Sequence, residues 1–263
     1  PDRPMDILTR LYRLPTGRFH YTLLGLIGVG WLFDAMDTGL VSFVLPTLSQ
    51  QWQLTPAQSG WIVSVAFVGM ALGAVASGWA ADRFGRRNVF VGTMVLYSIA
   101  TGLCALSPSL PILLFCRFWV GFGLGGQLPV AVSLVSEFAP PAVRGRLIVL
   151  LESFWGLGWL AAALASWGFI PHFGWHSAFW IGALPIFYAL WVWRKLPESV
   201  PYLLARGRVD EAHALVSRLE ARADLPVVTE AVVAATATHE PIRFGQLWKP
   251  PFARRTLMLW LIW

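Results

Sequence analysis

The sequence carries little charge for its length. Only 13% of its 263 residues are Asp, Glu, Lys or Arg, whereas 56% are apolar and the mean hydropathy is +0.60. Soluble globular domains contain about 25% charged residues, so this composition excludes a soluble chain and indicates a membrane protein. Cysteine is also scarce: Cys104 and Cys116 both lie in apolar runs, and with 15 Trp and 17 Phe the sequence does not fit a disulfide-stapled secreted domain.

Groups that could hold a metal or perform covalent catalysis are not clustered in the sequence. His172 and His176 are four residues apart, but Pro171 and Gly174 predict a loop over 169–176, which disfavours a metal pair. No nucleophile lies beside a recognisable base. We therefore expect no metal, no cofactor and no enzyme activity.

Long apolar runs are what the sequence does contain. A helix needs about 20 residues to cross the ~30 Å hydrocarbon layer, and six runs reach or approach that length. They cover residues 21–45, 60–81, 89–106, 112–136, 147–168 and 177–193. A seventh run begins at Thr256 and has too few residues to span, so we expect a partial chain whose remainder forms another membrane half. The sequence thus predicts an all-α polytopic membrane protein.

Three parts follow from these runs. Residues 1–193 are expected to form a six-helix transmembrane domain, residues 194–255 a cytoplasmic linker, and residues 256–263 the start of a seventh helix. Within the linker, apolar residues recur at helical spacing and predict an amphipathic helix over 209–219. These apolar residues are Val209, Ala212, Leu215, Val216 and Leu219.

The basic residues lie on one side of the predicted spans. Loops 46–59, 107–111 and 169–176 contain no Lys or Arg, and all 20 basic residues except Arg117 fall on the other side. By the positive-inside rule the N-terminus is cytoplasmic, in a multi-pass plasma membrane protein of the bacterial inner membrane type. The net charge of +6 therefore maps the cytoplasmic face, and no nucleic-acid partner is expected.

The loop between the second and third spans carries a distinctive pattern, GWAADRFGRR, from Gly78 to Arg87. Gly85 permits a tight turn, and Asp82 can pair with neighbouring arginines. Positive-inside anchoring alone explains the arginines but not these two residues. The stretch resembles the signature of the major facilitator superfamily, G-x-x-x-D-R-x-G-R-R/K.

Three further stretches support this resemblance. Residues 117–123 resemble the family's R-x-x-x-G-x-G, and residues 137–145 resemble its E-x6-R-G loop. Residues 197–203 resemble the P-E-S-P-R-W-L of sugar porters, with Pro201 in place of the arginine.

The resemblance implies the N-terminal half of a twelve-helix transporter, built as a 3+3 inverted repeat and rocking about a midplane site. It also implies a cytoplasmic gate of salt bridges among Asp82, Arg86, Glu137 and Arg144. The partner half would then be the C-terminal six helices of the same transporter, within the lipid bilayer.

Two acids lie inside the first span. Asp34 and Asp37 are three residues apart and share one helix face. An acid at bilayer depth costs several kcal/mol unless it faces a cavity or a partner, so it indicates a functional site. The alternative is a buried pair with Arg117 that orders the bundle. Residues 33–46 resemble the D-G-x-D region of aromatic acid/proton symporters and niacin transporters, with Ala35 where glycine is usual.

The fifth span carries a second candidate face. Glu152, Trp155, Gly156 and Trp159 recur at i, i+3, i+4 and i+7, which places a carboxylate, a glycine for close helix approach and two indoles together. Indoles stack on flat ligands and their N–H groups donate hydrogen bonds. Residues 150–159 resemble the niacin transporter branch most closely.

Other residues in the spans receive simpler interpretations. Near the outer boundary, tryptophans are expected to face lipid or the interface; these are Trp167, Trp175 and Trp180. Gln127 is polar at the depth of the candidate site and is included in it. Glycines four residues apart predict close helix packing; these are Gly69 with Gly73, and Gly121 with Gly125.

Together these features predict a secondary transporter that imports a small aromatic carboxylate such as nicotinate, coupled to protons. The predicted substrate-binding residues are Asp34, Asp37, Arg117, Gln127, Glu152, Trp155 and Trp159, and the predicted proton-coupling residues are Asp34, Asp37 and Glu152. A sugar or organic-cation facilitator or symporter is the nearest alternative. A non-transporting receptor and an intramembrane aspartyl enzyme also stay open, although two aspartates on one helix disfavour aspartyl chemistry.

Overall fold

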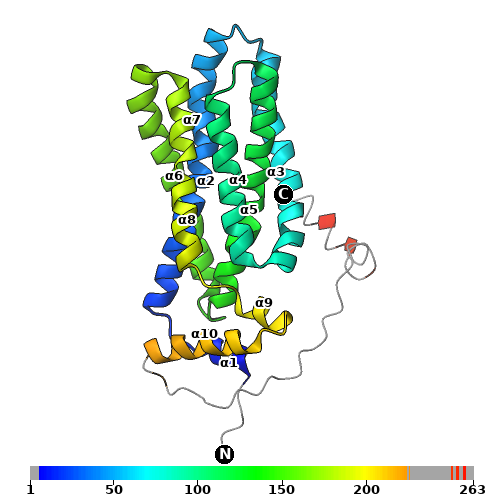
Figure 1. Cartoon of the computed structure of the whole chain (residues 1–263), viewed down its shortest axis with the longest axis vertical. Coiled ribbons are helices and arrows are strands. Elements are labelled where there is room, and N and C mark those ends of the chain that lie inside the picture. Colours follow the sequence, from blue (N-terminus) through cyan, green and yellow to red (C-terminus); the bar gives the residue numbers. More distant parts are fainter. Residues whose placement is uncertain (1–5, 224, 226–249, 251–252, 255–256, 259–263) are drawn as a thin grey trace, which may run out of the picture.

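The computed structural model describes residues 6–223, 225, 250, 253–254 and 257–258. Six helical segments are long and apolar enough to cross a membrane, and they run side by side (Figure 1). They are α2 (Arg18–Gln51), α3 (Pro56–Phe84), α4 (Arg86–Ala105), α5 (Leu110–Phe138), α6 (Arg144–Phe173), and α7 (Trp175–Ala183) with α8 (Pro185–Lys195) as the sixth. The predicted all-α, multi-pass membrane fold is confirmed.

The helices extend beyond the apolar runs that predicted them. Pro46, which directly follows the first apolar run, and Pro171, in the predicted loop, lie inside α2 and α6. The predicted loop over 169–176 is wrong: α6 continues to Phe173, and only Gly174 separates it from α7. A proline removes one backbone hydrogen bond but is tolerated in membrane helices, where neighbouring groups compensate for it. His172 and His176 consequently lie on two different helices.

Local sequence signals place two of the helix ends. Thr55 accepts a hydrogen bond from the Gln58 backbone N–H at 3.3 Å and caps α3, and Pro56 occupies its first position. Gly85 separates α3 from α4 with φ of 97°, a backbone conformation that glycine adopts without strain. The turn in the GWAADRFGRR pattern therefore depends on glycine, as the sequence predicted.

The six segments are not equivalent in burial. In α2, 72% of the apolar window is buried, whereas in α3 and α6 only 22% is buried, so α2 is central and the other two present open flanks. Helix α2 packs chiefly against α6, and α3 packs chiefly against α5. If α2–α4 and α5–α8 are two repeats of three spans, α2 corresponds to α5 and α3 corresponds to α6. A two-fold rotation that exchanges the repeats then exchanges the α2–α6 pair with the α5–α3 pair. The packing therefore matches the expected inverted repeat.

Glycines bring α3 and α5 into close contact. A Cβ atom added to Gly73 would lie against the Phe122 backbone, and one added to Gly121 would lie against the Ala66 backbone, both too close for a side chain. Gly69 and Gly125 are equally restricted. The predicted small-residue packing is confirmed, since without a hydrophobic force between helices in lipid, close backbone approach provides the attraction.

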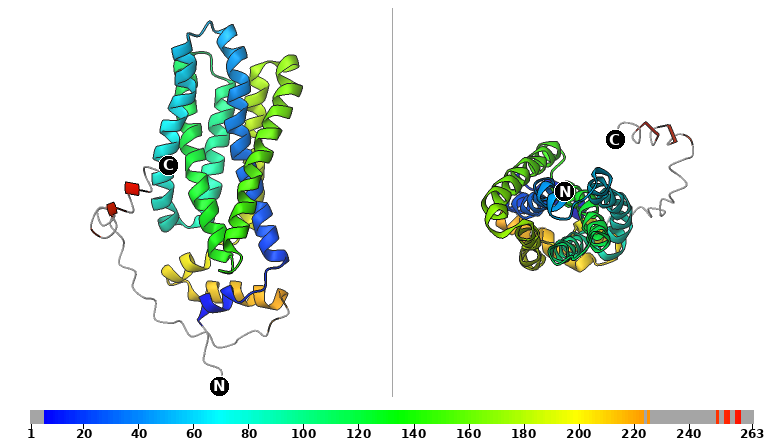
Figure 2. Two further views of the ribbon diagram at one scale, coloured as in Figure 1. Left: turned by 180° about the vertical axis from the view of Figure 1, so that it is seen from behind. Right: turned by 90° about the horizontal axis from the view of Figure 1, so that it is seen from above.

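Three short helices lie across one end of the bundle (Figures 1 and 2). They are α1 (Ile7–Tyr12), α9 (Val200–Ala205) and α10 (Val209–Arg222). Helix α10 confirms the predicted amphipathic helix: it buries Ala212, Val216 and Leu219. Most of the remaining predicted linker, and most of the predicted seventh-helix start at 256–263, lie outside the described residues.

A buried ion pair ties α1 to α10. The Arg10 guanidinium contacts both carboxylate oxygens of Glu220, at 2.9 and 2.5 Å, and also donates to Ser217 at 3.1 Å. The side chains of Arg10 and Glu220 are 0% and 5% exposed.

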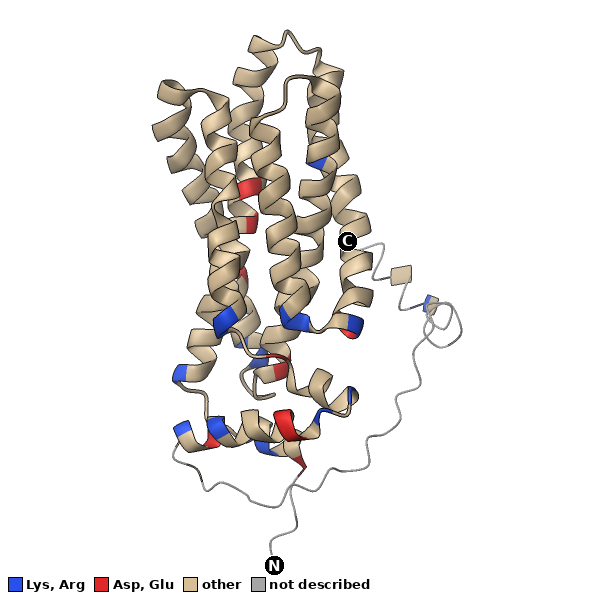
Figure 3. Cartoon of the chain, viewed as in Figure 1, with Lys and Arg blue, Asp and Glu red and all other residues tan. Residues whose placement is uncertain are grey.

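Most described Lys and Arg residues gather at this end of the bundle (Figure 3), which we call the basic end.

Candidate functional site

The two acids of α2 point into the six-helix bundle. Asp37 accepts a hydrogen bond from the Thr101 hydroxyl on α4 at 2.7 Å, and its second oxygen lies 3.4 Å from the Arg117 guanidinium on α5. A Cβ on Gly182 of α7 would lie 2.9 Å from the same carboxylate. Asp37 and Arg117 are 1% and 4% exposed, so a buried ion pair joins α2 to α5 at this depth.

Asp34 lies one turn away in a different environment. It is also 1% exposed, yet neither carboxylate oxygen has a hydrogen-bond partner among the described residues. The Gln127 side chain on α5 is equally buried, and neither its oxygen nor its nitrogen has a partner there. Gln127 lies against Gly30, one turn before Asp34. Buried polar groups are normally hydrogen-bonded, so these two side chains identify an unsatisfied polar region inside the bundle.

The predicted face of α6 lies elsewhere. Glu152 is exposed, Trp155 is half-buried and Trp159 is 38% exposed. The Trp155 ring packs on Trp31 of α2, with centroids 4.8 Å apart and planes tilted by 39°. Trp159 lies against Gly39 of α2. These three side chains therefore follow the open flank of α6 and do not contact Asp37 or Arg117.

Trp31 links the buried acids of α2 to the tryptophans of α6. Its ring touches Trp155, it precedes Asp34 by one turn, and its indole nitrogen is buried without a partner among the described residues. The structure thus separates the predicted site into an interior group, Asp34, Asp37, Arg117 and Gln127, and a flank group, Glu152, Trp155 and Trp159. Sequence reasoning missed Trp31, although its spacing from Asp34 places it on the same helix face.

Within this chain Gly156 makes no close helix contact, because a Cβ there would meet nothing within 4 Å; Gly158, two residues on, packs against the α2 backbone. One expectation about this region is wrong. Trp175 does not face lipid: it is 1% exposed and donates from its indole nitrogen to Gln51 at 2.8 Å. Trp167, at 81% exposed, fits the lipid-facing interpretation.

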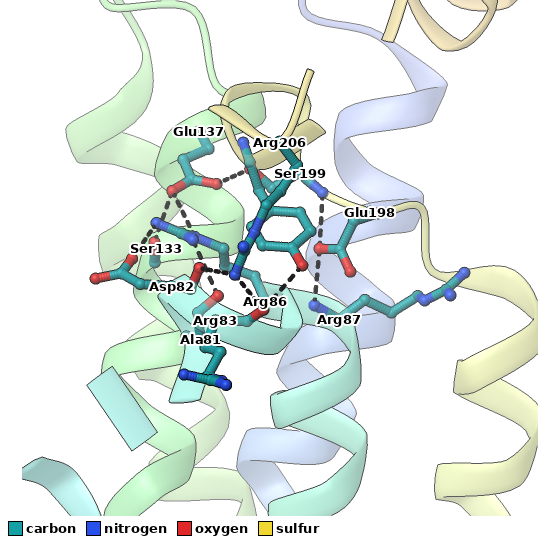
Figure 4. Close-up of polar contacts among 11 residues, drawn as sticks. Ala81, Asp82, Arg83, Arg86, Arg87, Ser133, Glu137, Glu198, Ser199 and Arg206 are labelled. Atoms are coloured by element: carbon teal, nitrogen blue, oxygen red, sulfur yellow. Dashed lines mark hydrogen bonds and ion pairs between the residues drawn. The ribbon is translucent and has the colours of Figure 1, made fainter. Parts of the chain in front are cut away.

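Three of the four predicted gate residues, Asp82, Arg86 and Glu137, lie together at the basic end (Figure 4). The Arg86 guanidinium lies 2.8 Å from Asp82 and 3.2 Å from Glu137, and it donates to the Ala81 carbonyl at 3.0 Å. Glu137 also accepts hydrogen bonds from the hydroxyls of Ser133, at 2.9 Å, and Ser199. This carboxylate therefore connects α4, α5 and the start of α9.

The segment after α8 completes this cluster. Glu198 accepts hydrogen bonds from the backbone N–H groups of Arg87, at 3.1 Å, and Ser199, at 3.0 Å. Arg206 donates to the carbonyls of Asp82 and Arg83 at the end of α3, at 3.2 and 2.5 Å. Ser199 and Arg206 were not predicted. The P-E-S resemblance pointed to this stretch without showing what it contacts.

Arg144 does not join these ion pairs in the described structure. It donates to the Ala139 carbonyl at 3.4 Å, and its guanidinium lies over the Tyr12 ring at 5.6 Å. In the predicted gate Arg86 therefore pairs with both acids, Asp82 and Glu137, whereas Arg144 contacts a backbone carbonyl and the last residue of α1.

Comparison with known proteins places these features in a family. The profile of the sugar (and other) transporter family matches residues 27–263. The niacin transporter NiaP of Acinetobacter baylyi is 60% identical over 259 residues, 98% of this chain and 59% of the relative. The 4-hydroxybenzoate transporter PcaK of the same organism is 32% identical over 264 residues, 98% of this chain and 57% of the relative.

A solved structure shares the fold. The proton:xylose symporter XylE, of the major facilitator superfamily, superposes with a TM-score of 0.69 at 21% identity, covering 78% of this chain and 51% of that one. The chain thus spans about half the length of the transporters it matches. The family profile and the six membrane-length helices lead to one assignment, and the fold is that of a solved major facilitator superfamily symporter: the chain belongs to the sugar (and other) transporter family.

Proposed function

We propose that the full-length protein imports a small aromatic carboxylate such as nicotinate, together with a proton, by alternating access. The observation that carries the substrate class is the 60% identity to a named niacin transporter over nearly the whole chain. The relative named for 4-hydroxybenzoate, another aromatic carboxylate, supports the same class.

The flank group provides the ring contacts of this proposal. Trp31 and Trp155 already pack on each other with tilted planes, and Trp159 leaves part of its ring exposed. Aromatic pairs stabilise each other by about 0.5–1.5 kcal/mol beyond their buried area, so a flat ligand can add a further ring contact here. Because α6 presents an open flank in this chain, we assign the opposite wall of the binding site to the C-terminal half of the transporter.

A proton partner follows from charge. Moving one negative charge inward against the membrane potential costs about 2.3 kcal/mol per 100 mV, and a proton moved with it cancels that cost. Of the acids in the interior group, Asp37 has Thr101 and Arg117 as donors, whereas Asp34 has no donor among the described residues. We assign proton binding to Asp34 first, with Asp37 and Glu152 as the other candidates.

The basic end forms the gate in this proposal, and it faces the cytoplasm of a bacterial inner membrane by the positive-inside rule. The bonds of Arg86 and Glu137 hold α3, α4, α5 and α9 together, and they would break as the two halves of the transporter rock apart on this side. Residues 1–193 are then the first membrane domain, 194–255 the linker, and 256–263 the beginning of the second domain.

Uptake into proteoliposomes tests the coupling. The full-length protein, with radiolabelled nicotinate outside, should take up several-fold more nicotinate under an inward acid gradient than without one. Asp34→Asn should remove this stimulation, while Asp6→Asn, a change in an acid outside the spans, should keep it. Nicotinate uptake that ignores the gradient would disprove proton coupling and leave the family assignment intact.

A sugar or organic-cation substrate is the second candidate, because the matched family is named for sugars and the solved relative is a xylose symporter. Competition among nicotinate, glucose and a quaternary amine for quenching of tryptophan emission distinguishes the candidates. Nicotinate alone should quench at low concentration. Preferential quenching by glucose or the amine would replace the aromatic carboxylate.

A further inference from the structure

A cavity of about 770 Å³ lies at the basic end, away from both groups of the candidate site. It is lined by the segment before α2, the start of α2, the end of α8 with the residues that follow it, and the second half of α10. Its volume is within the ~300–1,000 Å³ range of sites that bind small molecules or head groups. Nothing in the transport proposal uses this cavity.

Four cations line the cavity: Arg18, Lys195, Arg218 and Arg222. No Asp or Glu is among the described residues that line it, and no ion pair links any of the four to a described acid. Two nearby arginines, unlike these four cations, are in ion pairs: Arg10 pairs with Glu220, and Arg208 pairs with Glu211. Among the described residues, the cavity therefore concentrates positive charge that no acid compensates.

The Arg208 pair makes the contrast clear. Arg208 donates to both carboxylate oxygens of Glu211 at 2.6 Å, which lowers the pKa of the Glu211 carboxyl and keeps it charged. Arg208 and Glu211 line an adjacent cavity of about 410 Å³. That cavity shares Lys195 and Arg218 with the first but contains acids, so an anion is better accommodated in the first.

Apolar side chains complete the chemistry. Leu23 and Leu26 of α2 line the same cavity, and they begin the apolar stretch of a membrane-spanning helix. A soluble phosphate ester would need the cations but not this apolar wall. A phospholipid has both parts, a phosphate and acyl chains that run along a membrane helix. Basic pockets between membrane helices are known to bind anionic head groups.

The α1–α10 ion pair fixes the position of α10, which lines one side of this cavity. Because Arg10 and Glu220 are buried and bonded, α10 is held across the ends of α2 and α8 with Arg218 and Arg222 on it. We propose that the cavity between α2, α8 and α10 binds an anionic phospholipid, with its phosphate on Lys195 and Arg218 and its acyl chains along Leu23 and Leu26.

Native mass spectrometry of the detergent-purified full-length protein tests this site. The probes are phosphatidylglycerol and phosphatidylcholine with identical acyl chains. Each cation near a membrane surface contributes about fivefold to the affinity for anionic lipid, so Lys195→Gln/Arg218→Gln should bind phosphatidylglycerol about 25-fold more weakly. The control Arg83→Gln/Arg146→Gln removes two exposed charges that line neither cavity and should change binding less than threefold.

Two further arms make the result decisive. Arg218→Lys keeps the charge and should retain binding, and equal unfolding temperatures of all variants exclude a folding defect. Equal loss in both double variants, or equal binding of phosphatidylcholine, would overturn the proposal. Displacement of phosphatidylglycerol by millimolar glycerol phosphate would assign the cavity to a soluble phosphate ester and would equally overturn the lipid site.

Discussion

Replacing Arg117 by methionine removes the cation beside Asp37 while keeping most of the side-chain volume. Both partners are nearly inaccessible, at 4% and 1%, so the Asp37 carboxylate would keep only the Thr101 hydroxyl as a partner. Breaking a buried pair by deleting one partner costs about 3–5 kcal/mol. The 3.4 Å contact is long and the Thr101 bond persists, so we expect the lower end, about 3 kcal/mol, or roughly 150-fold in the folding equilibrium.

The matched double variant separates structure from transport. Removing both charges, as Asp37→Asn/Arg117→Met, leaves no uncompensated charge at the position of this pair and should restore stability to within about 1 kcal/mol of the original. Thermal unfolding of the full-length protein in detergent, followed by tryptophan emission, should show a fall of about 6–12 °C for the single variant and recovery in the double.

Nicotinate uptake by the original protein, the single variant and the double variant decides whether the Asp37–Arg117 pair takes part in transport or only orders the bundle. If the pair belongs to the transport machinery, the double variant is stable but takes up little nicotinate. An unfolding temperature as low in the double variant as in the single one would refute the energetic reasoning. Uptake that recovers together with stability would show that the pair only orders the bundle.

Three other changes test separate parts of the structure. Gly73→Ala places a Cβ against the Phe122 backbone and should destabilise by about 1–3 kcal/mol in thermal unfolding, whereas Gly78→Ala on the same helix meets nothing within 4 Å and should not; equal effects would refute close α3–α5 packing. Glu137→Gln removes the charge that accepts from Arg86 and Ser199, so amide exchange in α9 should rise about tenfold or more, while Asp82→Asn, whose side chain is 75% exposed, should change it less than fivefold. Trp159→Ala should weaken nicotinate binding about fivefold in equilibrium dialysis, whereas Trp167→Ala should leave it unchanged; an equal response would remove Trp159 from the site.

The membrane-spanning helices were predictable because the bilayer imposes a minimum apolar length, and that length is visible in the sequence. Their ends were not, because a helix continues past the hydrocarbon layer wherever its backbone remains bonded. Pro46 follows the first apolar run and Pro171 lies in the predicted loop, yet both prolines lie inside helices, α2 and α6. A proline on its own does not reveal whether neighbouring helices compensate for its missing N–H.

Helical spacing also located the polar residues without showing which helix each one meets. It placed Asp34 with Asp37, and Glu152 with Trp155 and Trp159. Only the packing of α2 shows that Asp37 contacts α4 and α5 while the tryptophans follow the flank of α6. A period of 3.6 residues fixes a face of one helix, whereas the identity of the opposing helix is a property of the whole bundle.

The layer at the basic end shows a similar limit. The amphipathic pattern over 209–219 predicted α10. The ion pair between Glu220 and Arg10 was not predictable, because the two residues are more than 200 positions apart and no sequence motif relates them. Likewise, Ser199 reads as the cap of a short helix, and its contact with Glu137 follows only from the fold.

Counterflow with the full-length protein tests the central claim most directly. Proteoliposomes loaded with unlabelled nicotinate and diluted into trace labelled nicotinate should accumulate the label transiently, and this requires both substrate recognition and alternating access but no proton gradient. We predict accumulation of label with nicotinate inside, and little with glucose or a quaternary amine inside. Absence of nicotinate counterflow by a protein that still binds nicotinate would contradict transport, and counterflow of glucose or the amine instead would contradict the substrate.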